Sequence, residues 1–148
     1  MKYTRATTTV EPVAEQVIRA YHPHLVEARI GYLFREKASK SKGRLVAGKA
    51  ARFPERYQVF FDGEDFDFLI EFAEDIWAKL DDEKRLALLD HELSHCWGEE
   101  DEKTGKTKWS VIGHDAEEFN AVARRHGPWT DELKALAKAL AKALGSTR

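Results

Sequence analysis

Two histidines four residues apart constrain the fold of this chain more than any other feature of its sequence. They frame the segment His91-Glu92-Leu93-Ser94-His95, which lies within a stretch of helical periodicity. On an α-helix, side chains four residues apart project from the same face, one turn apart. The fold must therefore present one helix with a polar His/Glu front and bury the leucine-rich back of that helix.

We expect this helix to run from about Asp82 to Trp97. Asp81 is the expected N-cap, and the acids that follow it suit the positive end of the helix dipole. The predicted buried face consists of Leu86, Leu89, Leu93 and Cys96 or Trp97. The face predicted to border a cleft consists of Leu88, His91, Glu92 and His95.

A histidine pair of this kind can bind one tetrahedral zinc ion at about 2.0–2.1 Å. Glu92 follows the first ligand directly, so it can take a proton from a zinc-bound water and return it to a leaving amine. These residues predict a zinc-dependent peptidase, a hydrolase of peptide bonds, with Glu92 as its catalytic base. The alternative is that both histidines are structural.

A catalytic zinc site needs a third protein ligand and an open fourth position. The segment 111–119 offers several candidates, and His114 is the predicted ligand because it stands at the entrance of the next expected helix, Asp115–Arg125. Glu118, one helical turn further on, is the second candidate. His114 could instead be a helix N-cap, and the acids near it could orient the ligands or favour the helix N-terminus.

The remaining pattern predicts an α+β fold, with a small, mostly antiparallel sheet beside the zinc helix. We expect one domain over residues 1–148, frayed at 1–10 and 145–148. The other expected helices are Glu11–Tyr21 and a last helix that is capped by Thr130 and buries Leu133, Leu136, Leu140 and Leu144. Strands are expected at 28–35, 44–52, 57–61 and 66–72, with a polar connection at 37–42, a turn at 62–65 and a loop at 98–108. The strand at 66–72 is the expected sheet edge for an extended peptide substrate.

Composition restricts the partners and the compartment. The net charge is −2, there is one cysteine, Cys96, and no apolar run is long enough to span a membrane. We therefore expect a cytoplasmic protein without a membrane partner. The segment from Arg35 to Arg56 contains eight basic residues and only two acidic ones, so it could contact nucleic acid. A solvated strand and loop is the favoured interpretation of that segment.

Two segments, ALLDHELSHCW at 87–97 and GHDAEEF at 113–119, resemble a family of phage metallopeptidases. The resemblance covers about Ala28 to Trp129. More distantly, the two motifs are similar to SprT-like (Spartan-type) zinc peptidases, although Phe119 lies five rather than four residues after the histidine. The resemblance implies a zincin-like fold with one zinc ion, a peptide or protein substrate and location in a host cytoplasm. It also implies that His91, His95 and His114 are the ligands and Glu92 the base. The alternative functions are a non-catalytic, zinc-stabilised regulatory protein and a nucleic-acid-associated accessory protein.

Overall fold

The computed structural model describes residues 1–60 and 65–145 and has an α+β fold, as predicted. The chain forms two compact units, Met1–Ile112 and Gly113–Arg148. None of the described helices is both long and apolar enough to cross a membrane.

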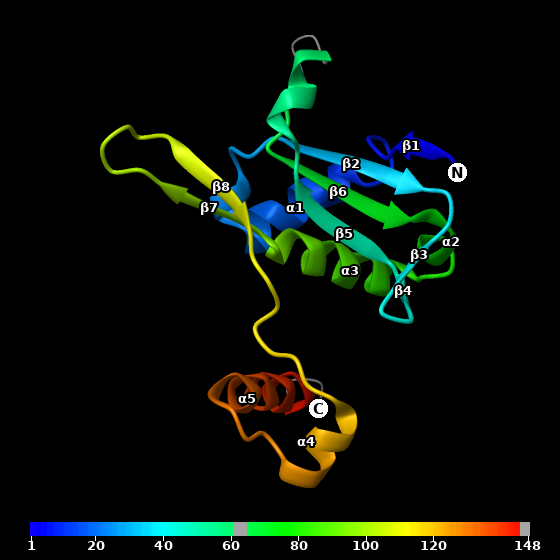
Figure 1. Cartoon of the computed structure of the whole chain (residues 1–148), viewed down its shortest axis with the longest axis vertical. Coiled ribbons are helices and arrows are strands. Elements are labelled where there is room, and N and C mark those ends of the chain that lie inside the picture. The colour runs from blue at the N-terminus through cyan, green and yellow to red at the C-terminus, as the bar shows by residue number, and fades with distance from the viewer. Residues whose placement is uncertain (61–64, 146–148) are drawn as a thin grey trace. The chain divides into compact units, whose positions relative to one another are not determined.

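The first unit is built on a four-stranded sheet (Figure 1). Its strand order is β1 (Tyr3–Arg5), β2 (Ile30–Arg35), β6 (Phe68–Ala73) and β5 (Gly48–Arg52). The β2 and β6 strands are parallel, and the two outer strands are antiparallel to their neighbours. Strand β6 is therefore central and β5 is an edge, so the prediction that residues 66–72 form the edge is wrong.

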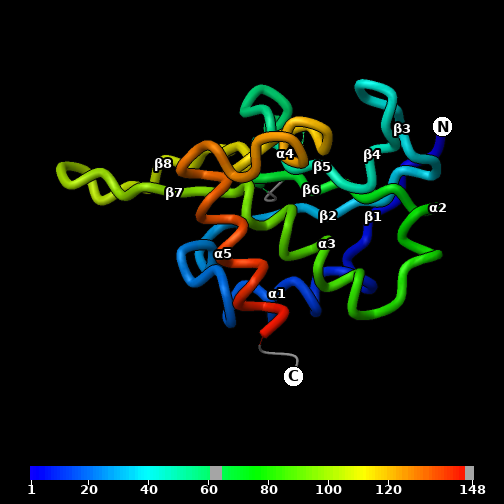
Figure 2. Tube along the Cα trace, turned by 90° about the horizontal axis from the view of Figure 1, so that it is seen from below, coloured from blue at the N-terminus to red at the C-terminus, as the bar shows by residue number. Residues whose placement is uncertain are grey.

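Two helices, α1 (Glu11–Tyr21) and α3 (Asp82–Ser94), lie on the same side of this sheet (Figure 2). Successive side chains of a strand point to opposite faces of the sheet, so every second residue of β2 and β6 points to the side on which these helices lie. Because these positions carry large apolar residues, they form one buried core with both helices. The core includes Tyr32, Phe34, Phe68, Ile70 and Phe72 from the strands, Ala14, Val17 and Ile18 from α1, and Leu89 and Leu93 from α3.

The start of the chain is part of this structure. Strand β1 pairs with the end of β2, and the following Ala6 and Val10 are fully buried in the core. The expectation that residues 1–10 are frayed is therefore wrong, because it took a polar sequence as a sign of disorder. Of the other predicted frayed end, residues 146–148 lie outside the described part of the chain.

The segment from residue 37 to 60 differs most from its prediction. The polar connection contains β3 (Ser39–Ser41), which pairs with β4 (Arg44–Val46). The turn between them is Lys42-Gly43, with φ of 51° and 78°, as a two-residue turn of a tight hairpin requires. The single strand predicted at 44–52 is therefore two strands, β4 and β5.

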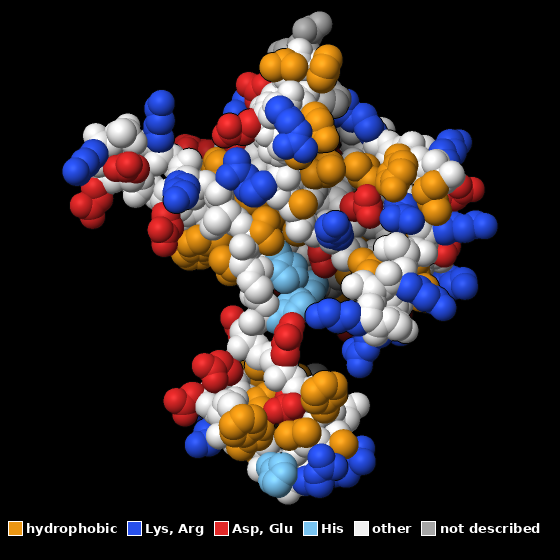
Figure 3. All heavy atoms as spheres, in the orientation of Figure 1, with side chains coloured by type: hydrophobic (Ala, Val, Ile, Leu, Met, Phe, Trp, Pro, Cys, Tyr) orange, Lys and Arg blue, Asp and Glu red, His pale blue; other side chains and the backbone are white. Residues whose placement is uncertain are grey.

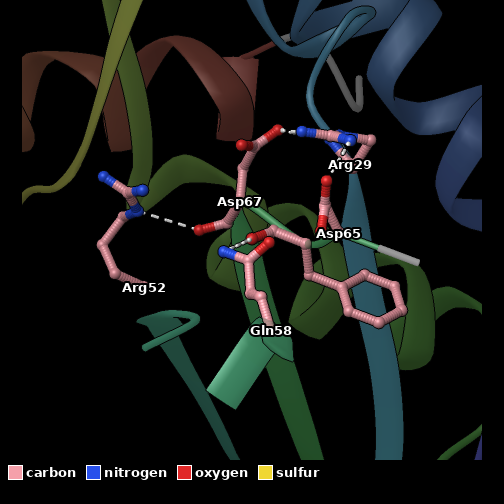
Figure 4. Close-up of polar contacts among 6 residues, drawn as sticks. Arg29, Arg52, Gln58, Asp65 and Asp67 are labelled. Carbon is pink, nitrogen blue, oxygen red and sulfur yellow. Dashed lines mark hydrogen bonds and ion pairs between the residues drawn. The ribbon is translucent and has the colours of Figure 1, made fainter. Parts of the chain in front are cut away.

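A 3₁₀ helix, η2 (Glu55–Phe60), replaces the strand predicted at 57–61, and residues 61–64 of the expected hairpin lie outside the described residues. Pro54 precedes this helix and its carbonyl accepts from the Tyr57 backbone N–H at 3.0 Å, which starts a turn rather than a strand. Figure 4 shows the polar contacts at its base, where Gln58 Nε2 donates to the Phe66 carbonyl at 3.2 Å.

A second hairpin, β7 (Cys96–Glu100) with β8 (Thr107–Val111), occupies the region predicted as the end of a helix and a loop. Gly98 is required there, because a Cβ at this position would lie 2.5 Å from the Trp109 ring. The hairpin is fastened to the sheet by Arg52, whose guanidinium donates to the Trp109 carbonyl at 2.5 Å. The same guanidinium donates to the Asp67 carbonyl at 2.8 Å (Figure 4). Short elements α2 (Glu74–Trp77) and η1 (Pro23–Leu25) complete the unit.

The second unit contains α4 (Asn120–His126) and α5 (Asp131–Gly145). Gly127 has a φ of 65° and ends α4 at His126, one residue after the predicted end. The Thr130 hydroxyl accepts from the Leu133 backbone N–H at 3.1 Å, which confirms the predicted cap. Helix α4 begins five residues later than predicted. The leucine stripe of α5 exists, but Leu136, Leu140 and Leu144 are exposed, so the prediction that they are buried is wrong.

Candidate metal centre

Helix α3 is firmly anchored, and this anchorage determines which residues it presents to solvent. The Asp81 carboxylate accepts from the Lys84 backbone N–H at 2.8 Å, which confirms the predicted N-cap. Leu89 and Leu93 are fully buried, whereas Leu86 is exposed and does not belong to the apolar face predicted for it. The helix ends at Ser94 instead of Trp97 because the chain turns there into β7.

The structure brings His91 and His95 together. Their ring centroids lie 5.1 Å apart, with the ring planes at 78°. His95 is the residue after the last helical one, but its φ of −73° and ψ of −19° are still helical, so the four-residue spacing keeps both rings on one face. His91 is exposed and His95 is half-buried.

His95 is oriented by a backbone group that the sequence did not reveal. Its Nδ1 lies 2.6 Å from the carbonyl oxygen of Ile112, and its own carbonyl accepts from the Ile112 N–H at 2.8 Å. A carbonyl can only accept, so Nδ1 carries the hydrogen, and in the neutral ring the lone pair is then on Nε2. A neutral imidazole fixed in this tautomer is the form that binds metals.

Glu92 lies beside this pair and is almost completely buried, with 4% of its surface exposed. One carboxylate oxygen is 3.8 Å from Nε2 of His91. Its side chain packs against the edge strand β5, where a Cβ on Gly48 would lie 3.0 Å from the Glu92 Cγ and 3.1 Å from its Cδ. A residue other than glycine would therefore push against the carboxylate.

A second histidine pair, His22 and His24, lies at the end of α1. His22 is buried, with 7% of its surface exposed, and its Nε2 lies 2.6 Å from a carboxylate oxygen of Asp90. His24 Nε2 lies 3.3 Å from the Cys96 carbonyl, and its ring contacts Trp97. Asp90 thus links α3 to the end of α1.

Cys96 is buried in the core, as predicted. Burial, and after it the negative charge of Glu92, raises the pKa of the Cys96 thiol to about 12. The thiol is therefore protonated at neutral pH. Because metals bind the thiolate, Cys96 is a poor ligand candidate in spite of its place next to His95.

His114 lies in the loop that precedes α4, two residues beyond Ile112. Because Ile112 is hydrogen-bonded to His95 and two residues span at most about 7 Å, the covalent chain keeps His114 within reach of that ring. His114 Nδ1 lies 3.1 Å from a carboxylate oxygen of Glu117, so its Nε2 is the ring nitrogen that does not face this carboxylate. The group His91, His95 and His114 could hold a metal ion.

Glu118, the alternative third ligand, has different partners. Its carboxylate accepts from the Phe119 backbone N–H at 2.8 Å and from the Trp129 indole at 3.0 Å. Glu118 lies before α4 rather than within it, so the predicted helical face that it would share with His114 does not exist. Nor is His114 a helix N-cap, because that position is occupied by Phe119.

The comparisons with known proteins agree with a metal-dependent peptidase. The model of the family described as "Putative phage metallopeptidase" matches residues 1–141, and the chain belongs to this family. No match was found among curated proteins or among solved structures. Family membership supports a peptidase that uses a metal ion and acts on a protein or peptide.

Proposed function

We propose that this phage metallopeptidase family member is a zinc-dependent peptidase in which His91, His95 and His114 bind one zinc ion and Glu92 is the general base. The observation that carries the proposal is the His91–His95 pair, with ring centroids 5.1 Å apart beside a buried carboxylate. A structural zinc site fills its fourth position with protein, whereas this set of three leaves one position for water.

The donor set fits zinc. Three neutral imidazoles are a common ligand set for catalytic zinc, and harder ions prefer oxygen ligands. The Ile112 carbonyl and the Glu117 carboxylate each accept from the Nδ1 of a proposed ligand. Such partners fix the ring and raise the basicity of the nitrogen that faces the metal.

Zinc bound there would polarise the substrate carbonyl and make water acidic enough to be deprotonated near neutral pH. The Glu92 carboxylate then accepts that proton and passes it to the nitrogen of the departing amine. Its burial against β5 holds it in place for both transfers and keeps bulk water from competing for the proton.

We further propose that the substrate lies along β5. Within the described residues this strand pairs with β6 only, so its outer edge can pair with an extended peptide. Gly48 lies against Glu92, and a peptide paired along this edge would therefore pass the proposed base.

Metal analysis combined with peptide cleavage tests the proposal. The purified protein should contain one zinc per chain, and Glu92→Gln should keep the zinc while losing at least about a hundredfold in kcat. His114→Ala should lose zinc, whereas Glu118→Ala should keep it. A protein in which Glu92→Gln cleaves peptides at the wild-type rate would refute the peptidase proposal and leave a zinc-stabilised scaffold.

A further inference from the structure

The edge strand β5 lies within the most basic part of the molecule. The β3–β4 hairpin leads directly into the strand, and η2 follows it after Phe53 and Pro54. Figure 3 shows Lys and Arg side chains gathered over both regions. The exposed basic residues on these elements, called here the basic rim, are Lys40, Lys42, Arg44, Lys49, Arg52 and Arg56.

Among the described residues the basic rim has more positive than negative charge, because its six cations are accompanied by Glu55 next to Arg56 and by Glu71 across the ladder from Lys49. No member forms an ion pair with a described residue; the described ion pairs of unit 1 involve other side chains. Arg52 donates its hydrogen bonds to two backbone carbonyls, and Arg56 donates to the Tyr57 hydroxyl. None of these acceptors carries a charge, so the rim keeps its positive potential.

We propose that the basic rim selects acidic polypeptide segments as substrates, with Lys40, Arg44 and Lys49 as specificity-determining residues. This inference rests on the proposed function. The rim lies at both ends of β5, while Gly48 and Glu92 lie at the start of the strand. Asp or Glu residues on either side of the cleaved bond would thus meet cations as the substrate pairs with the strand.

The same charges could attract a nucleic acid, but the site favours a polypeptide. An exposed strand edge offers alternating backbone N–H and C=O groups, which match those of an extended peptide. A phosphate backbone offers acceptors only, so half of the edge would lose its partners. Charge complementarity and the free edge together therefore favour an acidic peptide.

Three quenched fluorescent peptides would test the preference. They share one cleavable core, flanked on both sides by Glu-Glu, Gln-Gln or Lys-Lys. An exposed charge pair contributes a factor of about 1.5 to 5, so three pairs favour the Glu peptide by at least about threefold and disfavour the Lys peptide by a similar factor. The predicted kcat/KM ratio between the two peptides is therefore at least roughly tenfold at low salt. The ratio should decrease in about 0.5 M NaCl, where screening is stronger.

The variant Lys40→Gln/Arg44→Gln/Lys49→Gln should reduce the ratio to about three or less. The matched control is Lys134→Gln/Lys138→Gln/Lys142→Gln, which removes the same charge from the exposed face of α5 and should keep the ratio. The three rim substitutions are also made singly. If thermal unfolding shows that the triple variant is misfolded, the preference is tested with the single variants instead. Equal cleavage of the Glu and Lys peptides by the wild-type protein would overturn the proposal.

Binding separates this proposal from the proposed function. Glu92→Gln protein is titrated against labelled, uncleavable versions of the Glu and Lys peptides and against an oligothymidine of the same charge. If no peptide is cleaved but the Glu peptide binds through the rim residues, the proposed function fails and the acidic preference stands. Tighter binding of the oligothymidine than of the Glu peptide, lost in the rim variant, would overturn the preference in favour of nucleic acid.

Discussion

Gly48→Ala is the sharpest test of the geometry around Glu92. The new Cβ would lie 3.0 Å from the Glu92 Cγ, 3.1 Å from its Cδ and 3.3 Å from a Phe72 ring carbon. These contacts are too short by a few tenths of an ångström, and both neighbours are buried. The Phe72 ring is held in the core, so the Glu92 carboxylate is the group that must move.

The expected cost can be worked out from this crowding. One extra methyl group in a packed site destabilises a protein by about 1–3 kcal/mol. A displaced general base loses its alignment with the proton that it must accept, so we expect kcat to fall by about 10- to 100-fold. Zinc content should not change, because the three atoms nearest to the new Cβ belong to Glu92 and Phe72 and not to a proposed zinc ligand.

The assay compares zinc content, peptide cleavage and urea unfolding of Gly48→Ala with those of the wild-type protein. Gly145→Ala is the matched control, because a Cβ at that position has nothing within 4 Å. Wild-type activity in Gly48→Ala would show that Glu92 does not lie against β5 as described. Loss of zinc together with activity would show that the damage reaches the ligands.

Three further predictions test the surroundings of the site. His22→Ala should lower the free energy of unfolding by about 1–3 kcal/mol, measured by urea denaturation, because it removes a buried partner of Asp90; an unchanged midpoint would show that the pair is not formed in solution. Gly98→Ala should weaken zinc binding by about 10- to 100-fold in a chelator competition. The new Cβ would push the Trp109 ring and shift β8, and with β8 the Ile112 carbonyl that orients His95. An unchanged affinity would show that the hairpin does not influence zinc binding. Because the pKa of Cys96 is raised to about 12, folding favours its protonated form, and this stabilisation is present below about pH 9 and is lost as the pH rises toward 12. Cys96→Ala should therefore show a smaller loss of unfolding free energy between pH 9 and 11 than the wild-type protein, and equal losses would contradict the assigned cause.

The sequence predicted well those features that depend on neighbours along the chain. Helix α1 has the predicted bounds, and the caps at Asp81 and Thr130 form as expected. The spacing of His91 and His95 was sufficient to bring their rings together, because four residues of helix fix that geometry alone. Local periodicity and capping carry this information without help from the rest of the fold.

The features that were missed depend on contacts between distant segments. Residues 57–60 have strand propensity, but Pro54 and the contact with the Phe66 carbonyl made them a 3₁₀ helix. The order of strands could not be predicted either: β6 became central because β2 pairs with one side of it and β5 with the other. Pairing of this kind is decided by tertiary packing, which a single sequence does not show.

The elements that the sequence missed are also those that complete the candidate site. The motif on α3 supplies His91, Glu92 and His95, but a helix alone cannot fix a ring tautomer or shelter a carboxylate. The β7–β8 hairpin brings the Ile112 carbonyl to His95, and β5 brings Gly48 to Glu92. Both partners act through backbone, Ile112 by its carbonyl and Gly48 by having no side chain, so neither has a residue type that marks it as functional. A histidine motif therefore locates such a site, whereas its alignment depends on backbone positions that only the fold reveals.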